Sequence, residues 1–117
     1  MLLKRTHTCG ALRLEHCEQE VTLNGWVNTR RDLGGVIFID LRDRYGLTQV
    51  VFSPQDQAEA HHLADELRSE YVIGIKGIVR ERDAENINPN LATGQIEVRV
   101  QQLHIYSRAN TPPFEIK

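Results

Sequence analysis

The sequence is poor in cysteine and has no long hydrophobic run. Cys9 and Cys17, the two cysteines in 117 residues, are too few and too irregularly placed for a disulfide scaffold, and no paired Cys/His spacing suggests a zinc site. Every apolar run is far too short to cross a bilayer, and the N-terminus lacks the apolar stretch of a signal peptide. We therefore expect a cytoplasmic protein without a bound metal.

The chain also lacks a strong excess of charge of one sign. Its formal net charge is −2, whereas proteins that hold nucleic acid by bulk electrostatics usually carry a strong positive excess. A hydrophobic fraction of 40% and a charged fraction of 26% are typical of one globular domain. If such a domain binds nucleic acid, it has to do so with a local patch and specific contacts.

Catalytic motifs are missing as well. The chain contains no glycine-rich phosphate loop, no G-x-S-x-G elbow and no H-E-x-x-H motif. Asp40 and Asp43 lie three residues apart on a strand and its exit, so they are expected to face opposite sides and to make a poor acid/base pair. We therefore predict a binding module with no catalytic residue of its own.

The pattern of apolar and polar residues predicts five strands and one helix. The strands are expected at residues 21–28, 36–42, 47–52, 71–82 and 95–107, with a turn at 32–35. The helix is expected to start with Ser53 as its cap and Pro54 at its first position. This order, with the helix between strands three and four, predicts an all-β OB-fold barrel of five strands, whose face on strands two and three binds oligonucleotides.

The end of the chain has the composition of a linker. Residues 109–113, with two consecutive prolines, are stiff and unsuited to a sheet. We expect an OB-fold domain at residues 1–107 and the beginning of a linker to a further domain at 108–117.

Phe38 departs from the expected alternation of the second strand. One face of this strand carries Ile37, Ile39 and Leu41. Phe38 shares the other face with Asp40 and Arg42, where solvent is expected. Three explanations stay open: a bent strand that buries both faces, a protein interface, or a platform on which a base stacks.

Polar residues near Phe38 favour base stacking. Arg30 and Arg31 precede the turn next to Phe38, and Gln49 projects from the third strand. Arginine can donate two N–H groups to a phosphate or a base carbonyl, and glutamine can both donate to and accept from a base edge. The loop between strands four and five and its flanks add further polar candidates, namely Arg82, Asn86, Asn88 and Glu97. Because a carboxylate repels phosphate, Glu97 would serve as a reader of base N–H groups.

Each of these residues also has a simpler interpretation. Gln49 can be an ordinary exposed strand residue, and Arg30 and Arg31 can belong to a solvated turn. Glu97 can be the surface partner of Arg99 or Arg82. From the pattern alone, the prediction is an OB-like domain that binds single-stranded nucleic acid.

A family resemblance narrows this prediction. The run G-W-V-N-x-R-R-D-L-G-G-x-I-F-I-D-L-R-D-R-x-G-x-x-Q-V-V-F at residues 25–52 strongly resembles the N-terminal anticodon-binding domain of bacterial-type aspartyl-tRNA synthetase. Further matches are R-T-H-x-C-G-x-L-R at 5–13, N-P-x-L-A-T-G-x-I-E-V at 88–98 and T-P-P-F at 111–114. The related lysyl and asparaginyl enzymes share the general scheme without these flanking motifs.

The resemblance implies that the domain recognises the anticodon G-U-C of tRNA(Asp). Phe38 matches the family's aromatic residue that stacks on the central uracil, and Gln49 and Arg31 match residues that contact the middle of the anticodon. Glu97 matches the reader of the first base. The region around the third base is matched by Arg82, Asn86 and Asn88.

Two positions depart from common family patterns. Thr29 stands where many members carry an arginine, which implies one potential phosphate contact fewer. Leu33 stands where some members carry a histidine associated with charging tRNA(Asn) as well, so leucine favours strict use of tRNA(Asp).

The parent enzymes of this family are class II aspartate–tRNA ligases. They activate aspartate with ATP and Mg²⁺ in a separate catalytic domain, and they are homodimers through that domain. The resemblance therefore implies no cofactor in this chain and gives no reason to expect that the chain itself dimerises. The competing hypothesis is a stand-alone OB domain that binds single-stranded nucleic acid or a protein partner.

Overall fold

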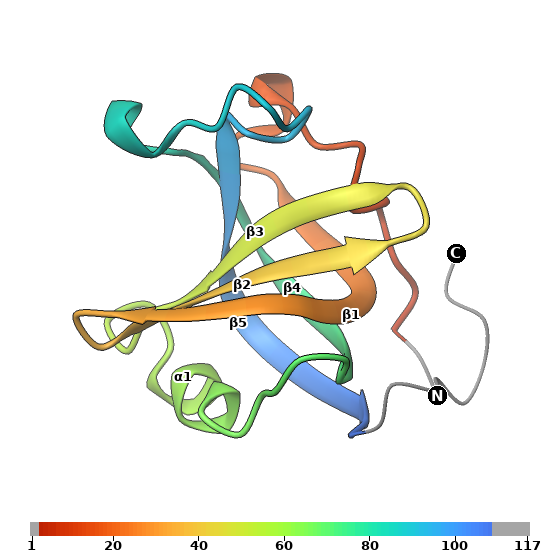
Figure 1. Ribbon diagram of the computed structural model, residues 1–117, viewed down its shortest axis with the longest axis vertical. Coiled ribbons are helices and arrows are strands. Elements are labelled where there is room, and N and C mark those ends of the chain that lie inside the picture. The colour runs from red at the N-terminus through yellow and green to blue at the C-terminus, as the bar shows by residue number, and fades with distance from the viewer. Residues whose placement is uncertain (1–2, 109–117) are drawn as a thin grey trace.

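The computed structural model describes residues 3–108 and shows a barrel of five strands (Figure 1). The strands are β1 (Glu20–Leu33), β2 (Val36–Asp43), β3 (Gly46–Phe52), β4 (Val72–Glu81) and β5 (Ile96–Ser107). The helices of this part of the chain are α1 (Ala58–Ala64) and the short 3₁₀ helices η1 (Leu14–His16) and η2 (Ala84–Asn86). The order of strands and helix is the one predicted for an OB-fold.

The barrel closes because β1 pairs with two neighbours. The first half of β1 pairs with β4, from Glu20 to Trp26, and the second half pairs with β2, up to Leu33. A register irregularity between Val27 and Thr29 accompanies this change of partner, as expected where a strand bends. The strands follow the order β1-β2-β3-β5-β4 around the closed barrel, in which β3 and β5 form the parallel pair. The structure confirms the predicted OB-fold topology.

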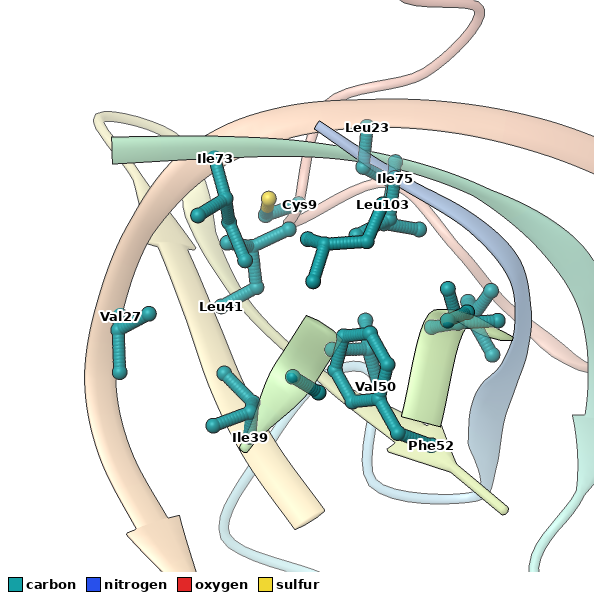
Figure 2. Packing of buried hydrophobic residues seen from close by; sticks show 14 of the residues in the cluster. Cys9, Leu23, Val27, Ile39, Leu41, Val50, Phe52, Ile73, Ile75 and Leu103 are labelled. Atoms are coloured by element: carbon teal, nitrogen blue, oxygen red, sulfur yellow. The ribbon is translucent and has the colours of Figure 1, made fainter. Parts of the chain in front are cut away.

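Inward-pointing apolar residues of all five strands fill the barrel. Ile39, Val50 and Phe52 lie close together inside it, as Figure 2 shows, and none of the three is exposed. Residues from the segment before β1 and from the helix region complete the core: Cys9, Leu12, Ala60, Ala64 and Leu67. The alternation in β2 is therefore as predicted, because its inward face is apolar and buried.

The helix begins later than the sequence predicted. The N–H groups of Asp56 and Gln57 donate to the carbonyl of Ser53 at 3.1 and 3.0 Å, and the Ser53 hydroxyl accepts from the N–H of Gln55 at 3.2 Å. These bonds form a turn that leads the chain away from β3, and α1 starts only at Ala58. The predicted start at Ser53 is wrong, because the side-chain bond of Ser53 stabilises a turn instead of capping a helix.

Strand β1 is longer and its turn is tighter than predicted. The strand continues to Leu33, so Arg30 and Arg31 are part of the β1–β2 ladder and not of a solvated turn. The turn consists of Gly34 and Gly35, whose φ angles are +56° and +84°. Positive φ at both positions gives a two-residue turn whose twist matches that of the two strands.

The predicted linker begins at the edge of the described part of the chain. β5 ends at Ser107, Arg108 follows it, and the rest of the predicted linker lies outside the described residues. Within residues 3–108, no helix is long and apolar enough to cross a membrane.

Candidate nucleic-acid interface

A groove of about 620 Å³ runs between the outer face of β1–β3 and the loop that joins β4 to β5. The predicted site residues that line it are Arg31, Phe38, Gln49, Arg82, Asn86 and Asn88. The structure therefore brings together side chains from three strands and from a loop that is distant from them in the sequence. Arg30 and Glu97 are not among the lining residues.

Phe38 offers an aromatic surface at this groove. Its neighbours in β2, Ile37 and Ile39, are buried, whereas Phe38 is half-buried and does not belong to the core cluster. Arg31 is its direct partner across the ladder, and the guanidinium carbon lies 5.9 Å from the centre of the ring. Cation–π contact of this kind holds the ring beside a positive charge, a combination that suits stacking of a base next to a phosphate.

A chain of hydrogen bonds crosses the floor of the groove. Arg31 donates from a terminal nitrogen to Oε1 of Gln49 at 2.9 Å, and Nε2 of Gln49 donates to Oε1 of Glu97 at 3.0 Å. Gln49 and Glu97 are only 4% and 8% exposed, so the interpretation of Gln49 as an ordinary exposed residue is wrong. Sequence alone could not show this, because the bond joins two strands and its residues are 48 positions apart.

Glu97 is also held from its other side. Nε of Arg99 donates to Oε2 of Glu97 at 2.8 Å, and the same guanidinium pairs with Asp56 at 3.1 Å. The predicted pairing of Glu97 with Arg99 is thus present, but the carboxylate is covered and bonded to Gln49 as well. Burial alone would lower the pKa of Arg99. The hydrogen bonds to Glu97 and Asp56 outweigh this effect, so the pKa of Arg99 is raised. These fixed bonds hold the Glu97 carboxylate and the Gln49 amide in one orientation.

Arg82 has a donor group that its surroundings leave unsatisfied. Its Nε donates to the carbonyl of Ile96 at 2.8 Å, and Nη1 donates to the carbonyl of Asn86 at 3.2 Å. Nη2 is buried and has no hydrogen-bond partner among the described residues. Burial lowers the pKa of Arg82, while the negative charges of Glu97 and Asp40 act in the opposite direction. A buried donor without an acceptor is costly, and Arg82 lines the groove, so a ligand oxygen that reaches Nη2 would relieve this cost.

The β4–β5 loop is ordered by its own backbone. The N–H of Asn88 donates to the carbonyl of Gly94 at 3.0 Å, and a Cβ atom at position 94 would lie only 1.8 Å from the carbonyl oxygen of Asn88. The side-chain Oδ1 of Asn88 accepts from the N–H of Asn90, so the amide N–H₂ group of Asn88 can face a ligand. Asn86, at the end of η2, is exposed. Both asparagines thus present polar groups on one wall.

Arg30 points away from the groove. Its guanidinium donates to backbone carbonyls at the end of α1, those of Asp65 at 2.9 Å and Leu67 at 2.8 Å, and forms an ion pair with Asp32 at 2.8 Å. The hydrogen bond to Asp32 is the main cause that raises the pKa of Arg30. A cation at a helix C-terminus is favourable, so Arg30 joins the β1–β2 hairpin to the helix.

The groove also contains residues that the sequence analysis did not select as binding residues. They are Thr29, Leu33, Asp40, Glu85 and Leu91. The hydroxyl of Thr29 donates to the carboxylate of Asp40 at 2.5 Å. The position of Asp40 on the same face as Phe38 was the signal available from the sequence. Within residues 3–108, no group of three or more His, Cys, Asp or Glu side chains is placed to hold a metal ion.

Comparison with known protein families identifies this barrel. The model of the tRNA anti-codon family, described as an OB-fold nucleic acid binding domain, matches residues 21–106. The chain belongs to this family. The match covers nearly all of the five strands and the loop of the groove, so the OB-fold domain and its groove lie within the family's common region.

Curated relatives agree with the resemblance seen in the sequence. The chain is 55% identical over 115 residues to the aspartate–tRNA(Asp/Asn) ligase of Desulfatibacillum aliphaticivorans, and 52% identical over 113 residues to the aspartate–tRNA ligase of Staphylococcus saprophyticus. These alignments cover 98% and 97% of the chain. The chain spans about a fifth of the length of these relatives, since 19% of each is covered.

Solved structures show the same barrel. The asparaginyl-tRNA synthetase of Pyrococcus horikoshii, in complex with asparaginyl-adenylate, superposes with a TM-score of 0.75 at 26% identity over 96% of this chain and 24% of that one. An OBody, AM2EP06, bound to hen egg-white lysozyme has a TM-score of 0.80 at 26% identity and covers 93% of this chain and 99% of its own. The predicted membership in the aspartyl-tRNA synthetase type of anticodon-binding domain is confirmed by these comparisons.

Proposed function

We propose that the OB-fold domain selects tRNA(Asp) by reading the anticodon G-U-C in its groove. The observation that carries this proposal is the juxtaposition of the half-buried Phe38 ring with the unsatisfied Nη2 of Arg82 and the Arg31–Gln49–Glu97 hydrogen-bond chain. A flat ring can stack on an unpaired base, and the polar groups around it can read that base and its neighbours.

Each residue has a distinct task in this proposal. Phe38 stacks on the central uracil, and Arg31 and Gln49 contact its polar edge. Glu97 lies beside the groove next to Gln49, and the 10% of its side chain that stays exposed accepts N–H groups of the first base at the acceptor sites left open by its bonds to Gln49 and Arg99. Arg82 reads the third base.

The loop completes the contacts to the third base. Asn86 and Asn88 lie on the wall formed by the β4–β5 loop, next to the guanidinium of Arg82. The amide N–H₂ of Asn88 suits a base carbonyl or a phosphate oxygen. Arg30 contributes indirectly in this proposal, because its bonds to the end of α1 fix the strand from which Arg31 projects.

We further propose that the chain acts as the anticodon-binding part of a longer aspartate–tRNA ligase. The high identity to such ligases over nearly the whole chain supports this assignment. The class II chemistry, in which aspartate is activated with ATP and Mg²⁺ and transferred to the tRNA in the cytoplasm, then belongs to the rest of that enzyme, as does its homodimer contact. Leu33, which is 59% exposed at the groove, favours strict use of tRNA(Asp).

A titration of the chain with RNA stem-loops tests the proposal. We expect the stem-loop that carries G-U-C to bind more tightly than three variants, each with one base of the triplet changed, at the same salt concentration. A mismatched base should cost roughly 1–3 kcal/mol where a polar reader is left without its partner. Equal affinity for all four stem-loops would overturn the proposal and favour a general single-strand binder, and an absence of RNA binding would favour a protein partner.

A further inference from the structure

Two arginines contact one exposed tyrosine at the turn between β2 and β3, and a third arginine lies nearby. The guanidinium carbons of Arg5 and Arg44 lie 5.4 and 5.9 Å from the centre of the Tyr45 ring. Tyr45 itself is 53% exposed. Arg42, the last exposed residue of β2 before the turn, lines the same hollow as Arg44 and Tyr45. We call these four residues the turn surface.

Arg5 and Arg42 give the turn surface a positive charge that is not balanced by ion pairs with carboxylates of the described residues. The carboxylate of Asp43, at the end of β2, is 3% exposed and accepts backbone N–H groups of Cys9, Tyr45 and Gly46 at 2.8, 2.8 and 3.1 Å. Among residues 3–108, no carboxylate forms an ion pair with Arg5 or Arg42, and Nη1 of Arg5 is buried without a hydrogen-bond partner.

Arg80 and Arg99 are placed differently from Arg5 and Arg42. Arg80, on the outer face of β4, pairs with Glu18 at 3.5 Å, and Arg99 pairs with Glu97 and Asp56. These pairs neutralise the surface on which they lie. In a chain with a net charge of −2, the turn surface is therefore a local positive region of the kind that a polyanion needs.

The turn surface continues the groove of the candidate interface. Arg42 follows Phe38 and Asp40 on the outer face of β2, and it lines a second hollow of about 370 Å³. Leu91 lines both this hollow and the groove, so the two adjoin at the β4–β5 loop. A strand bound in the groove can leave it over the turn surface without a break.

We infer that the turn surface binds the phosphodiester backbone of the RNA strand next to the triplet held in the groove. Arg42 and Arg44 donate N–H groups to phosphate oxygens, and the Tyr45 ring holds the guanidiniums of Arg5 and Arg44 in position by cation–π contact. This inference rests on the proposed function, since it places a flanking nucleotide relative to a triplet in the groove. It adds interactions that depend on charge and not on base sequence.

The variant that tests the inference removes two charges from the turn surface. Arg42→Gln combined with Arg44→Gln should weaken binding of the G-U-C stem-loop on the order of tenfold at low salt, because two phosphates are no longer neutralised by the protein. The slope of log K against log salt concentration should become shallower by about 0.7 for each of these phosphates. Discrimination among triplet variants should stay as it is in the unaltered chain.

Two further variants serve as controls. Lys76→Gln combined with Arg80→Gln also removes two positive charges, but from β4 and outside the turn surface and the groove, and should leave the salt slope nearly unchanged. Arg42→Lys combined with Arg44→Lys keeps the charge and should retain the slope, which separates removal of charge from damage to the turn. Thermal unfolding of each variant shows whether the fold is intact.

The phosphate that the turn surface binds can be found with modified RNA. Replacing single phosphates beside the triplet by uncharged methylphosphonates should weaken binding of the unaltered chain at one or two positions and have no further effect on the double glutamine variant. Equal weakening in both chains, or a salt slope equal to that of the control variant, would overturn the inference while leaving the proposed function in place. Equal affinity for all triplets would instead overturn the proposed function, and with it the inference.

Discussion

Gln49 donates its side-chain N–H to the carboxylate of Glu97 at 3.0 Å, across the parallel pair of β3 and β5. Because Arg31 donates to the carbonyl oxygen of the same amide, Gln49 cannot rotate by half a turn without breaking both bonds. Its donor and acceptor atoms are therefore fixed before any ligand arrives. Preorganisation of this kind lowers the entropy cost of binding.

Replacing the acceptor of this bond should reduce the discrimination between bases. In Glu97→Gln the shape is kept, but the amide has one acceptor oxygen where the carboxylate has two, so one of the bonds from Gln49 and Arg99 is lost and the other loses its charge, at about 1–2 kcal/mol each. We expect weaker binding of the G-U-C stem-loop and a smaller preference for guanine at the first position, measured by titration with first-base variants.

Glu81→Gln provides the matched control, since Glu81 is an exposed carboxylate at the end of β4, directly opposite Ile96. It should leave the preference for the first base unchanged. If Glu97→Gln altered stability but not the ranking of first-base variants, Glu97 would be a structural residue and not a reader.

Removing the aromatic ring from the groove should affect binding and not folding. Phe38→Ala should weaken binding of the stem-loop by about 1–3 kcal/mol, the usual contribution of one base–aromatic stack, with little change in the midpoint of urea unfolding. Phe52→Ala is the contrasting variant, because Phe52 is fully buried and its removal should destabilise the barrel by about 3–5 kcal/mol. Unfolding of the chain by Phe38→Ala would place Phe38 in the core.

Substitutions of the two adjacent arginines of β1 should affect different properties: Arg30 mainly folding stability, and Arg31 mainly RNA affinity. Arg30→Ala removes bonds to the end of α1 and should destabilise the fold by about 2 kcal/mol, measured by urea unfolding. Arg31→Ala, at an exposed position in the groove, should lower stability by only about 1 kcal/mol, the contribution of its bond to the Gln49 amide, but should weaken RNA binding. Equal effects of the two substitutions on RNA affinity would show that Arg30 contacts the RNA as well.

Stability should fall at alkaline pH because of Cys9. Burial above all, and then the neighbouring Asp43 carboxylate, raise the pKa of the Cys9 thiol well above its usual range. The folded state therefore favours the protonated thiol, whose contribution is complete below the unfolded thiol's pKa of about 8.5 and decreases as the pH rises above that value toward the folded pKa. Urea midpoints at pH 7 and pH 9.5 measure this decrease.

Cysteine variants identify the group responsible. Cys9→Ala removes the buried thiol and should reduce the difference between the two midpoints, even though it lowers stability at both pH values. Cys17→Ala should reduce it less, because Cys17 is only half-buried. The assignment to Cys9 fails if Cys17→Ala has the larger effect.

The barrel was predictable from the sequence because the side chains of a β-strand point alternately to its two faces. Ile37, Ile39 and Leu41 alternate with polar residues and Phe38, and this pattern depends on neighbours within one strand. The start of α1 was not predictable in the same way. Ser53 can cap a helix or close a turn, and the route of the chain out of β3 decides between them.

The arrangement of the polar residues depends on contacts that are distant in the sequence. The sequence alone predicts that Gln49 and Glu97 are exposed strand residues. In the fold, β3 lies beside β5, and the two side chains bury each other and form a hydrogen bond. The unsatisfied Nη2 of Arg82 likewise depends on the folded surroundings, in which Nε and Nη1 bond to the carbonyls of Ile96 and Asn86. Residue types in the sequence could suggest which side chains take part, but not which atoms remain available to a ligand.

The ladder between β1 and β2 places neighbouring residues on opposite sides of one strand, with Arg30 opposite Ile39 and Arg31 opposite Phe38. A shift of the ladder by a single residue would exchange these sides. The arginine that holds α1 would then face the groove, and the one beside Phe38 would face the helix. The hairpin should therefore tolerate substitutions of its side chains far better than an insertion or deletion of one residue between Thr29 and Gly34, which would damage the fold and the interface together.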